Sequence, residues 1–91
     1  MDISDPATVK RFFNGQGRIA AIPVKDDRKL QLLQHIATRF EAGRDYSEIE
    51  VNEILKTLHD DFPYLRRLLI EFELLDRDPR GSSYRLIETE D

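Results

Sequence analysis

The chain has no cysteine among its 91 residues, so disulfide bonds and thiolate metal sites are excluded. Long apolar runs are absent too, and no stretch approaches the roughly 20 residues of a membrane span. The first residues, MDISDPATVKRFF, lack the apolar core of a signal peptide. From these absences we expect a cytoplasmic protein with no membrane partner.

Catalytic and metal-binding side chains are also scarce. The two histidines, His35 and His59, fall in different predicted helices, and no cysteine is available to share a metal with either. The acidic pair that follows His59 is explained more simply by a histidine at the end of one helix and a capping aspartate at the start of the next. We therefore expect no enzyme, no metal site and no cofactor.

The N-terminal part of the chain is predicted to form a helix and a strand. Ser4 or Asp5 caps a helix in which Phe12 and Phe13 share an apolar face. The segment NGQG ends this helix. The apolar run RIAAIP, residues 18–23, lies between a glycine and a proline. Because the run is short, we expect a strand that pairs with a later hairpin.

Three further amphipathic helices supply the predicted core. The second helix covers residues 25–43, with Asp26 or Asp27 as its N-terminal cap and Gly43 at its end. The third begins at Ser47, where the segment SEIE has the spacing of a capping box, and the fourth follows a short turn. Their apolar stripes are Leu30, Leu33, Ala37 and Phe40; Val51, Ile54, Leu55 and Leu58; and Leu65, Leu68, Leu69 and Phe72.

The last part of the chain has the pattern of a hairpin. The segment DPRG, residues 78–81, has the preferences of a type I turn, and Tyr84 and Leu86 alternate after it. The order of elements predicts an α+β, mainly α fold. This fold is a single winged helix-turn-helix domain with an N-terminal helix, a short strand, three core helices and a C-terminal β-hairpin wing. Its core covers residues 5–87, and residues 88–91 form a frayed acidic tail.

The net charge of −4 is spread unevenly. Residues 62–87 carry five basic and four acidic side chains, whereas residues 26–61 carry five basic and nine acidic ones. In the fourth helix Arg67 lies opposite the apolar stripe, where a side chain that contacts base edges belongs. We predict a transcriptional regulator that binds double-stranded DNA, with Arg67 toward the bases and phosphate contacts from Tyr64, Arg66, Arg77, Arg80 and Arg85.

A protein-interaction module without DNA contact is an equally open interpretation. Arg67 and Glu71 are four residues apart and can pair along the helix. The acidic third helix would repel a DNA backbone. A homodimer or another regulatory protein would then be bound through Phe12, Phe13, Ile70 and Leu74. A third hypothesis, a small-ligand pocket near Tyr46 and Asn52, has the least support.

The segments GRIAAIPVK, YSEIEVNEIL, LRRLL and RDPRGSSY together resemble a bacterial family, domain of unknown function 2087, over residues 12–85. Family hairpins often continue with an aromatic residue where Arg85 stands here. The resemblance implies a winged-helix-like domain, found alone or joined to bacterial regulators with their own helix-turn-helix, and it implies no known reaction. It also directs attention to Asn52, which we expect to bond to the fourth helix or to the turn before it, and to Arg66, which we expect to bind Glu50 or the acidic turn.

Overall fold

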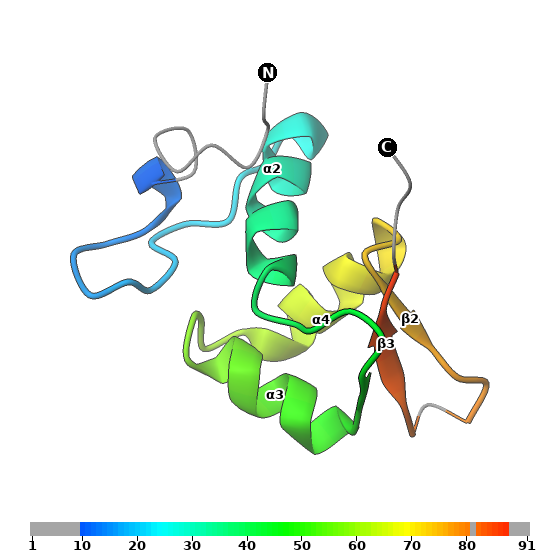
Figure 1. Ribbon diagram of the computed structural model, residues 1–91. Coiled ribbons are helices and arrows are strands. Elements are labelled where there is room, and N and C mark those ends of the chain that lie inside the picture. The colour runs from blue at the N-terminus through cyan, green and yellow to red at the C-terminus, as the bar shows by residue number, and fades with distance from the viewer. Residues whose placement is uncertain (1–9, 81, 88–91) are drawn as a thin grey trace.

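The computed structural model describes residues 10–80 and 82–87 of the chain. Within these residues the fold is α+β and mainly helical, as expected, with three α-helices and an antiparallel sheet of three short strands (Figure 1). None of the described helices is long and apolar enough to cross a membrane. The elements in chain order are the 3₁₀ helix η1 (Lys10–Phe12), α2 (Asp26–Ala37), β1 (Asp45–Tyr46), α3 (Glu48–Lys56), α4 (Phe62–Glu71), β2 (Leu75–Arg77) and β3 (Tyr84–Leu86).

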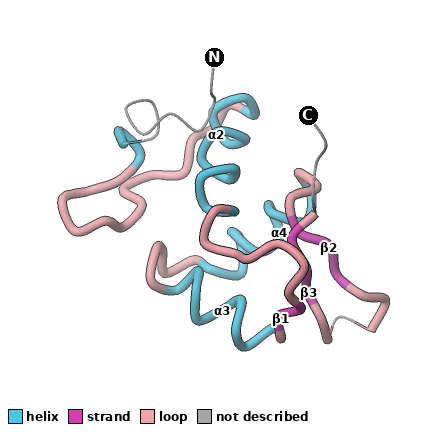
Figure 2. Tube along the Cα trace, in the orientation of Figure 1, coloured by secondary structure: helices cyan, strands magenta, loops and turns pink. Residues whose placement is uncertain are grey.

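The three α-helices pack together, and the sheet lies at one end of the bundle (Figures 1 and 2). α4 contacts α2, α3 and β2, while β1 contacts α3 and β3. η1 and the loop that follows it lie at the end opposite the β2–β3 hairpin (Figure 1). α4 therefore connects the helical bundle with the hairpin.

Apolar side chains from the helices and the sheet form a common core. The predicted stripes of α3 and α4 face this core, and Val51, Leu55, Leu65 and Leu69 are fully buried. Burying one such side chain stabilises the fold by roughly 1.5–3 kcal/mol. The stripe of α4 therefore determines which face of that helix points outward.

Local sequence explains where α3 and α4 begin. The predicted capping box is confirmed: the Ser47 hydroxyl accepts the Glu50 N–H at 3.1 Å, and the Glu50 carboxylate accepts the Ser47 N–H at 2.9 Å. Asp61 caps α4 by accepting the Tyr64 N–H at 3.4 Å, and Pro63 stands in the first turn, where a missing N–H costs nothing. These helix starts are encoded within a few residues of sequence.

α2 is shorter than predicted. The prediction that Asp26 or Asp27 caps it is wrong: the N-cap is Lys25, and both aspartates lie in the first turn, where negative charge suits the helix dipole. The helix ends at Ala37. Gly43, with a φ of 79°, belongs to the turn before β1 and does not end the helix.

In the described residues the N-terminal helix appears only as η1, and its predicted start at Ser4 or Asp5 lies outside them. The strand predicted over residues 18–23 is wrong. Among these residues Ile19 forms an isolated β-bridge, and its partner is Phe13 rather than a strand of the sheet.

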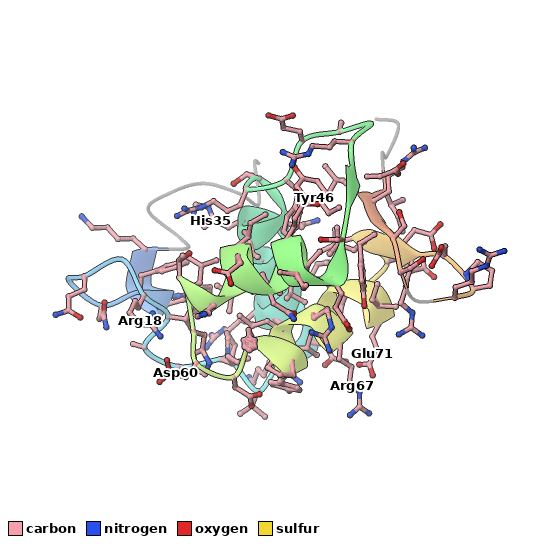
Figure 3. All side chains as sticks on the ribbon, turned by 90° about the horizontal axis from the view of Figure 1, so that it is seen from below. Arg18, His35, Tyr46, Asp60, Arg67 and Glu71 are labelled. Carbon is pink, nitrogen blue, oxygen red and sulfur yellow. The ribbon has the colours of Figure 1, made fainter. Side chains whose placement is uncertain are left out.

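The segment that includes Arg18 and Ile19 packs on the C-terminal end of α3 instead. The Ile19 N–H donates to the Leu58 carbonyl at 2.8 Å. Arg18 donates to the Lys56 carbonyl at 3.1 Å and pairs with Asp60 at 2.6 Å (Figure 3). A helix end leaves its last carbonyls without intrahelical partners, and a cation there suits the dipole. The segment therefore caps α3 and takes no part in the sheet.

The third strand of the sheet is β1, which the sequence does not predict. The strand order is β1-β3-β2, with Asp45 opposite Arg85 and Tyr46 opposite Tyr84. Across the hairpin, Asp76 faces Arg85. Both tyrosines are buried, so one face of the sheet covers the core and the other carries charged side chains.

Candidate functional site

A cleft of about 330 Å³ lies between α4 and the hairpin. Three arginines line it, Arg66 and Arg67 from α4 and Arg77 from β2. Guanidinium groups are strong donors to phosphate and carboxylate oxygens, and two of the three, Arg66 and Arg67, pair with Glu48 and Glu71. The remaining lining residues are Pro63, Ile70, Glu71 and Tyr84.

The register of the hairpin explains why Arg77 faces this cleft. Arg77 lies opposite Tyr84, and side chains of an opposed pair share one face of the sheet. Tyr84 faces the core, so Arg77 projects on the same side, at the end of β2, where it is exposed. Arg80 is exposed in the turn beyond it. Within the described part of the chain, neither Arg77 nor Arg80 forms an ion pair.

Arg67 lies on the outward face of α4. At about 100° per residue it is roughly 200° from both Leu65 and Leu69 of the buried stripe. Its side chain is 75% exposed, and Figure 3 shows it extending away from the helices with Glu71 beside it. Arg67 Nε donates to Glu71 Oε1 at 3.0 Å, which is the i,i+4 pair predicted from the sequence.

Arg66 points inward and ties α4 to α3. Its Nη1 donates to Asn52 Oδ1, and its Nη2 lies 3.5 Å from Glu48 Oε1. The same carboxylate accepts the Tyr84 hydroxyl at 3.4 Å, so this cluster joins α3, α4 and β3. The Arg66 side chain is 23% exposed. Of the two partners expected for Asn52, the fourth helix is therefore the one that it bonds to, and Arg66 is mainly engaged inside the protein.

Glu50, one expected partner of Arg66, binds elsewhere. Its carboxylate accepts the Ser47 N–H and pairs with Arg44 at 2.8 Å. The Ser47 hydrogen bond, with the charge of Arg44, lowers the pKa of the Glu50 carboxyl. Residues 48 and 50 are about 200° apart around a helix. Of the two glutamates, Glu48 is the one that faces α4.

The two other predicted phosphate contacts are less available. Arg85 lies on the face of the sheet opposite Arg77, and its Nε and Nη2 both contact Asp45 Oδ1 at 2.9 Å. Tyr64 is partly buried and packs against the core. The structure thus brings Arg66, Arg67 and Arg77 together in one cleft and leaves Arg85 and Tyr64 outside its lining.

The four residues of the alternative protein interface lie in two places. Phe12 is buried, and Phe13, Ile70 and Leu74 are partly buried against the core. Ile70 lines the cleft beside the hairpin, whereas η1, which contains Phe12, lies at the other end of the molecule (Figures 1 and 3).

Different apolar residues are exposed. Among the described residues the large exposed ones are Val24 and Ile49, with exposed fractions of 88% and 73%. Neither residue is among those predicted to contact a partner. For Ile49 a signal exists, because it lies among the glutamates of the first turn of α3 and outside the i, i+3, i+4 stripe.

Both histidines have structural partners. His59 Nδ1 accepts the Asp61 N–H at 2.9 Å in the turn between α3 and α4. The His35 ring packs edge-on against Phe13 with 5.4 Å between ring centroids, and burial together with the charge of Arg39 lowers the pKa of His35. Across residues 10–80 and 82–87, no three acidic, histidine or cysteine side chains are grouped to hold a metal ion.

Residues 18–86 match a family described as an uncharacterized protein conserved in bacteria, DUF2087. The chain belongs to this family. The resemblance to this family is therefore confirmed. In this chain the segments YSEIEVNEIL and LRRLL supply the bond between Asn52 and Arg66 at the α3–α4 junction. No curated protein and no solved structure matches the chain.

Proposed function

We propose that the protein is a winged-helix domain that binds double-stranded DNA and regulates transcription. The chain order α2, β1, α3, α4, β2, β3 supports this, because three helices precede a hairpin whose sheet is completed by a short strand from between the first two. In this assignment α3 and α4 are the helix-turn-helix. α4 is the recognition helix, and the hairpin is the wing.

The cleft between α4 and the hairpin carries the proposal. Arg67 of α4 and Arg77 of β2 approach it from two elements, and Arg80 extends the exposed positive charge along the hairpin. A recognition helix in the major groove offers hydrogen-bond donors to base edges, and a wing on the adjacent backbone offers cations to phosphates. We call Arg67, Arg77 and Arg80 the outer arginines and assign the DNA contacts to them.

The proposed interface is small. Arg66 and Arg85 are engaged by Glu48 and Asp45, so they add little to it. The exposed carboxylates of the first turn of α3 would repel the phosphates of a nearby DNA backbone. We therefore expect affinity to be measurable at low salt and to fall as salt rises.

Anisotropy of a fluorescent duplex at about 50 mM salt tests the proposal. The variant Arg77→Ala/Arg80→Ala should lose most of the binding. The matched control, Arg28→Ala/Arg39→Ala, removes two exposed arginines on and beside α2 and changes the net charge equally. It should bind almost as the wild type does. No binding by the wild type would contradict the proposal, and equal loss in both variants would contradict the assigned surface.

A protein-interaction function is the second candidate, and the exposed side chains of Val24 and Ile49 are the contacts that it would use. Light scattering of the wild type beside Val24→Asp and Ile49→Asp tests self-association. A wild-type dimer that either substitution converts to a monomer would support this candidate. A monomer in all three proteins would exclude self-association through these side chains.

A further inference from the structure

We infer that Arg67 contacts a guanine in the major groove and that Glu71 holds it in position to do so. This inference rests on the proposed DNA-binding function and specifies what its recognition helix selects. An exposed i,i+4 ion pair adds little to stability by itself. The geometry of this pair, however, leaves the base-contacting atoms of Arg67 available.

Glu71 engages only the inner nitrogen of the guanidinium. Arg67 Nε donates to Glu71 Oε1 at 3.0 Å, and the two terminal nitrogens donate no hydrogen bond to any other described residue. Figure 3 shows the tip of Arg67 pointing away from the protein. Two parallel N–H donors match the O6 and N7 acceptors that guanine presents in the major groove. The free end of Arg67 has that arrangement.

The pair also separates base contact from phosphate contact. Beside the Glu71 carboxylate, Arg67 has little net charge to offer a phosphate. Arg77 and Arg80 form no ion pair within the described residues, so their positive charge is available to a phosphate. Phosphate contacts position a protein on the duplex, while base contacts specify sequence. The outer arginines therefore divide these tasks, with Arg67 giving specificity and the hairpin giving attachment.

Holding Arg67 in place has a further benefit. A long exposed side chain loses rotamer freedom when it is fixed at an interface, and this loss weakens binding. The bond from Nε to Glu71 fixes part of the side chain before DNA arrives. Glu71 is therefore a positioning residue, and its removal should reduce the preference for guanine rather than the attachment to DNA.

Selection from a random duplex library with the full chain tests the inference. We expect the wild type to enrich duplexes that share a guanine at one position. Replacing this guanine by adenine should weaken binding about 5- to 150-fold. Substituting 7-deazaguanine, which lacks the N7 acceptor, should also weaken binding.

Two double variants that keep the net charge, and two single variants of Glu71 that change it equally, identify the residues responsible. Arg67→Ala/Glu71→Ala should lose the guanine preference and retain salt-dependent binding. The control Glu53→Ala/Lys56→Ala removes an exposed pair on α3, with 3.7 Å between its charged atoms, and should keep both properties. Glu71→Ala alone should reduce the preference, whereas Glu71→Gln, which keeps an acceptor for Nε, should retain it.

The outcomes separate this inference from the function on which it rests. No binding at low salt overturns the proposed function and the inference together. Salt-dependent binding without guanine enrichment overturns the inference alone, as does enrichment that persists in Arg67→Ala/Glu71→Ala. A guanine preference unchanged in Glu71→Ala overturns the positioning role.

Discussion

Arginines in two regions of the molecule differ in their burial and in their partners. One region is the α3–α4 junction, and the other is the outer surface formed by α4 and the hairpin. In the junction, Arg66 bonds to Asn52 and Glu48 and is mostly buried. On the outer surface, Arg67 and Arg77 are exposed. Arg66 and Arg67 are neighbours in sequence, but a helix turns about 100° between them. The role of each arginine therefore follows from the rotation of α4 relative to the core, and residue type alone does not determine it.

The largest expected effect comes from the apolar stripe that sets this rotation. Leu69 is fully buried, so Leu69→Ala should lower the free energy of unfolding by about 2–5 kcal/mol. Chemical denaturation followed by circular dichroism measures this change. A loss below about 1 kcal/mol would show that the stripe does not anchor α4 as the burial indicates.

The next effect separates the two neighbouring arginines. Arg66→Ala removes charged hydrogen bonds between α3 and α4 and should cost about 1.5–3 kcal/mol of stability. Arg67→Ala removes only an exposed pair and should cost less than about 0.5 kcal/mol. Denaturation curves of both variants provide the comparison. Equal destabilisation would contradict the distinction between junction and outer surface.

A smaller effect is expected at the start of α3, which presents Glu48 and Asn52 to Arg66. Ser47→Ala should lower stability by about 1 kcal/mol, because the Glu50 N–H loses its acceptor. Ser47→Asn is the control, since asparagine caps helices as well as serine does. If both substitutions destabilise equally, the hydroxyl is not acting as a cap.

The smallest effect is a pH dependence from the Glu50 carboxyl, whose pKa in the folded state is lowered mainly by the Ser47 hydrogen bond. Its stabilising contribution should be complete above the ordinary value of 4.5 and should be lost as the pH falls through the lowered pKa. Thermal unfolding of the wild type and Glu50→Gln from neutral to acidic pH measures it. The wild type should lose more stability on acidification, and parallel curves would contradict the linkage.

Features encoded over a few residues are predictable from the sequence. The capping box at Ser47 and Glu50 forms as expected because both partners lie within one helical turn. Asp78 likewise shapes the hairpin turn by accepting the Ser82 N–H at 2.8 Å and the Ser83 N–H at 3.3 Å. The pair between Arg67 and Glu71 follows from helical spacing alone.

Features that depend on distant pairing are not predictable in this way. β1 has two residues, and Asp45 finds its partner Arg85 far along the chain, so no local pattern marks the strand. The choice of Glu48 rather than Glu50 by Arg66 depends on how α3 is rotated against α4. Arg18 bonds to the end of α3, which the apolar pattern around it does not indicate.

The most direct test of the central claim is the salt dependence of duplex binding. Each neutralised phosphate contributes about −0.9 to the slope of log K against log salt, so contacts by Arg77 and Arg80 predict a slope near −2. Arg77→Ala/Arg80→Ala should bring that slope close to zero. No binding at low salt, or a slope that the double substitution leaves unchanged, would contradict DNA binding through α4 and the hairpin.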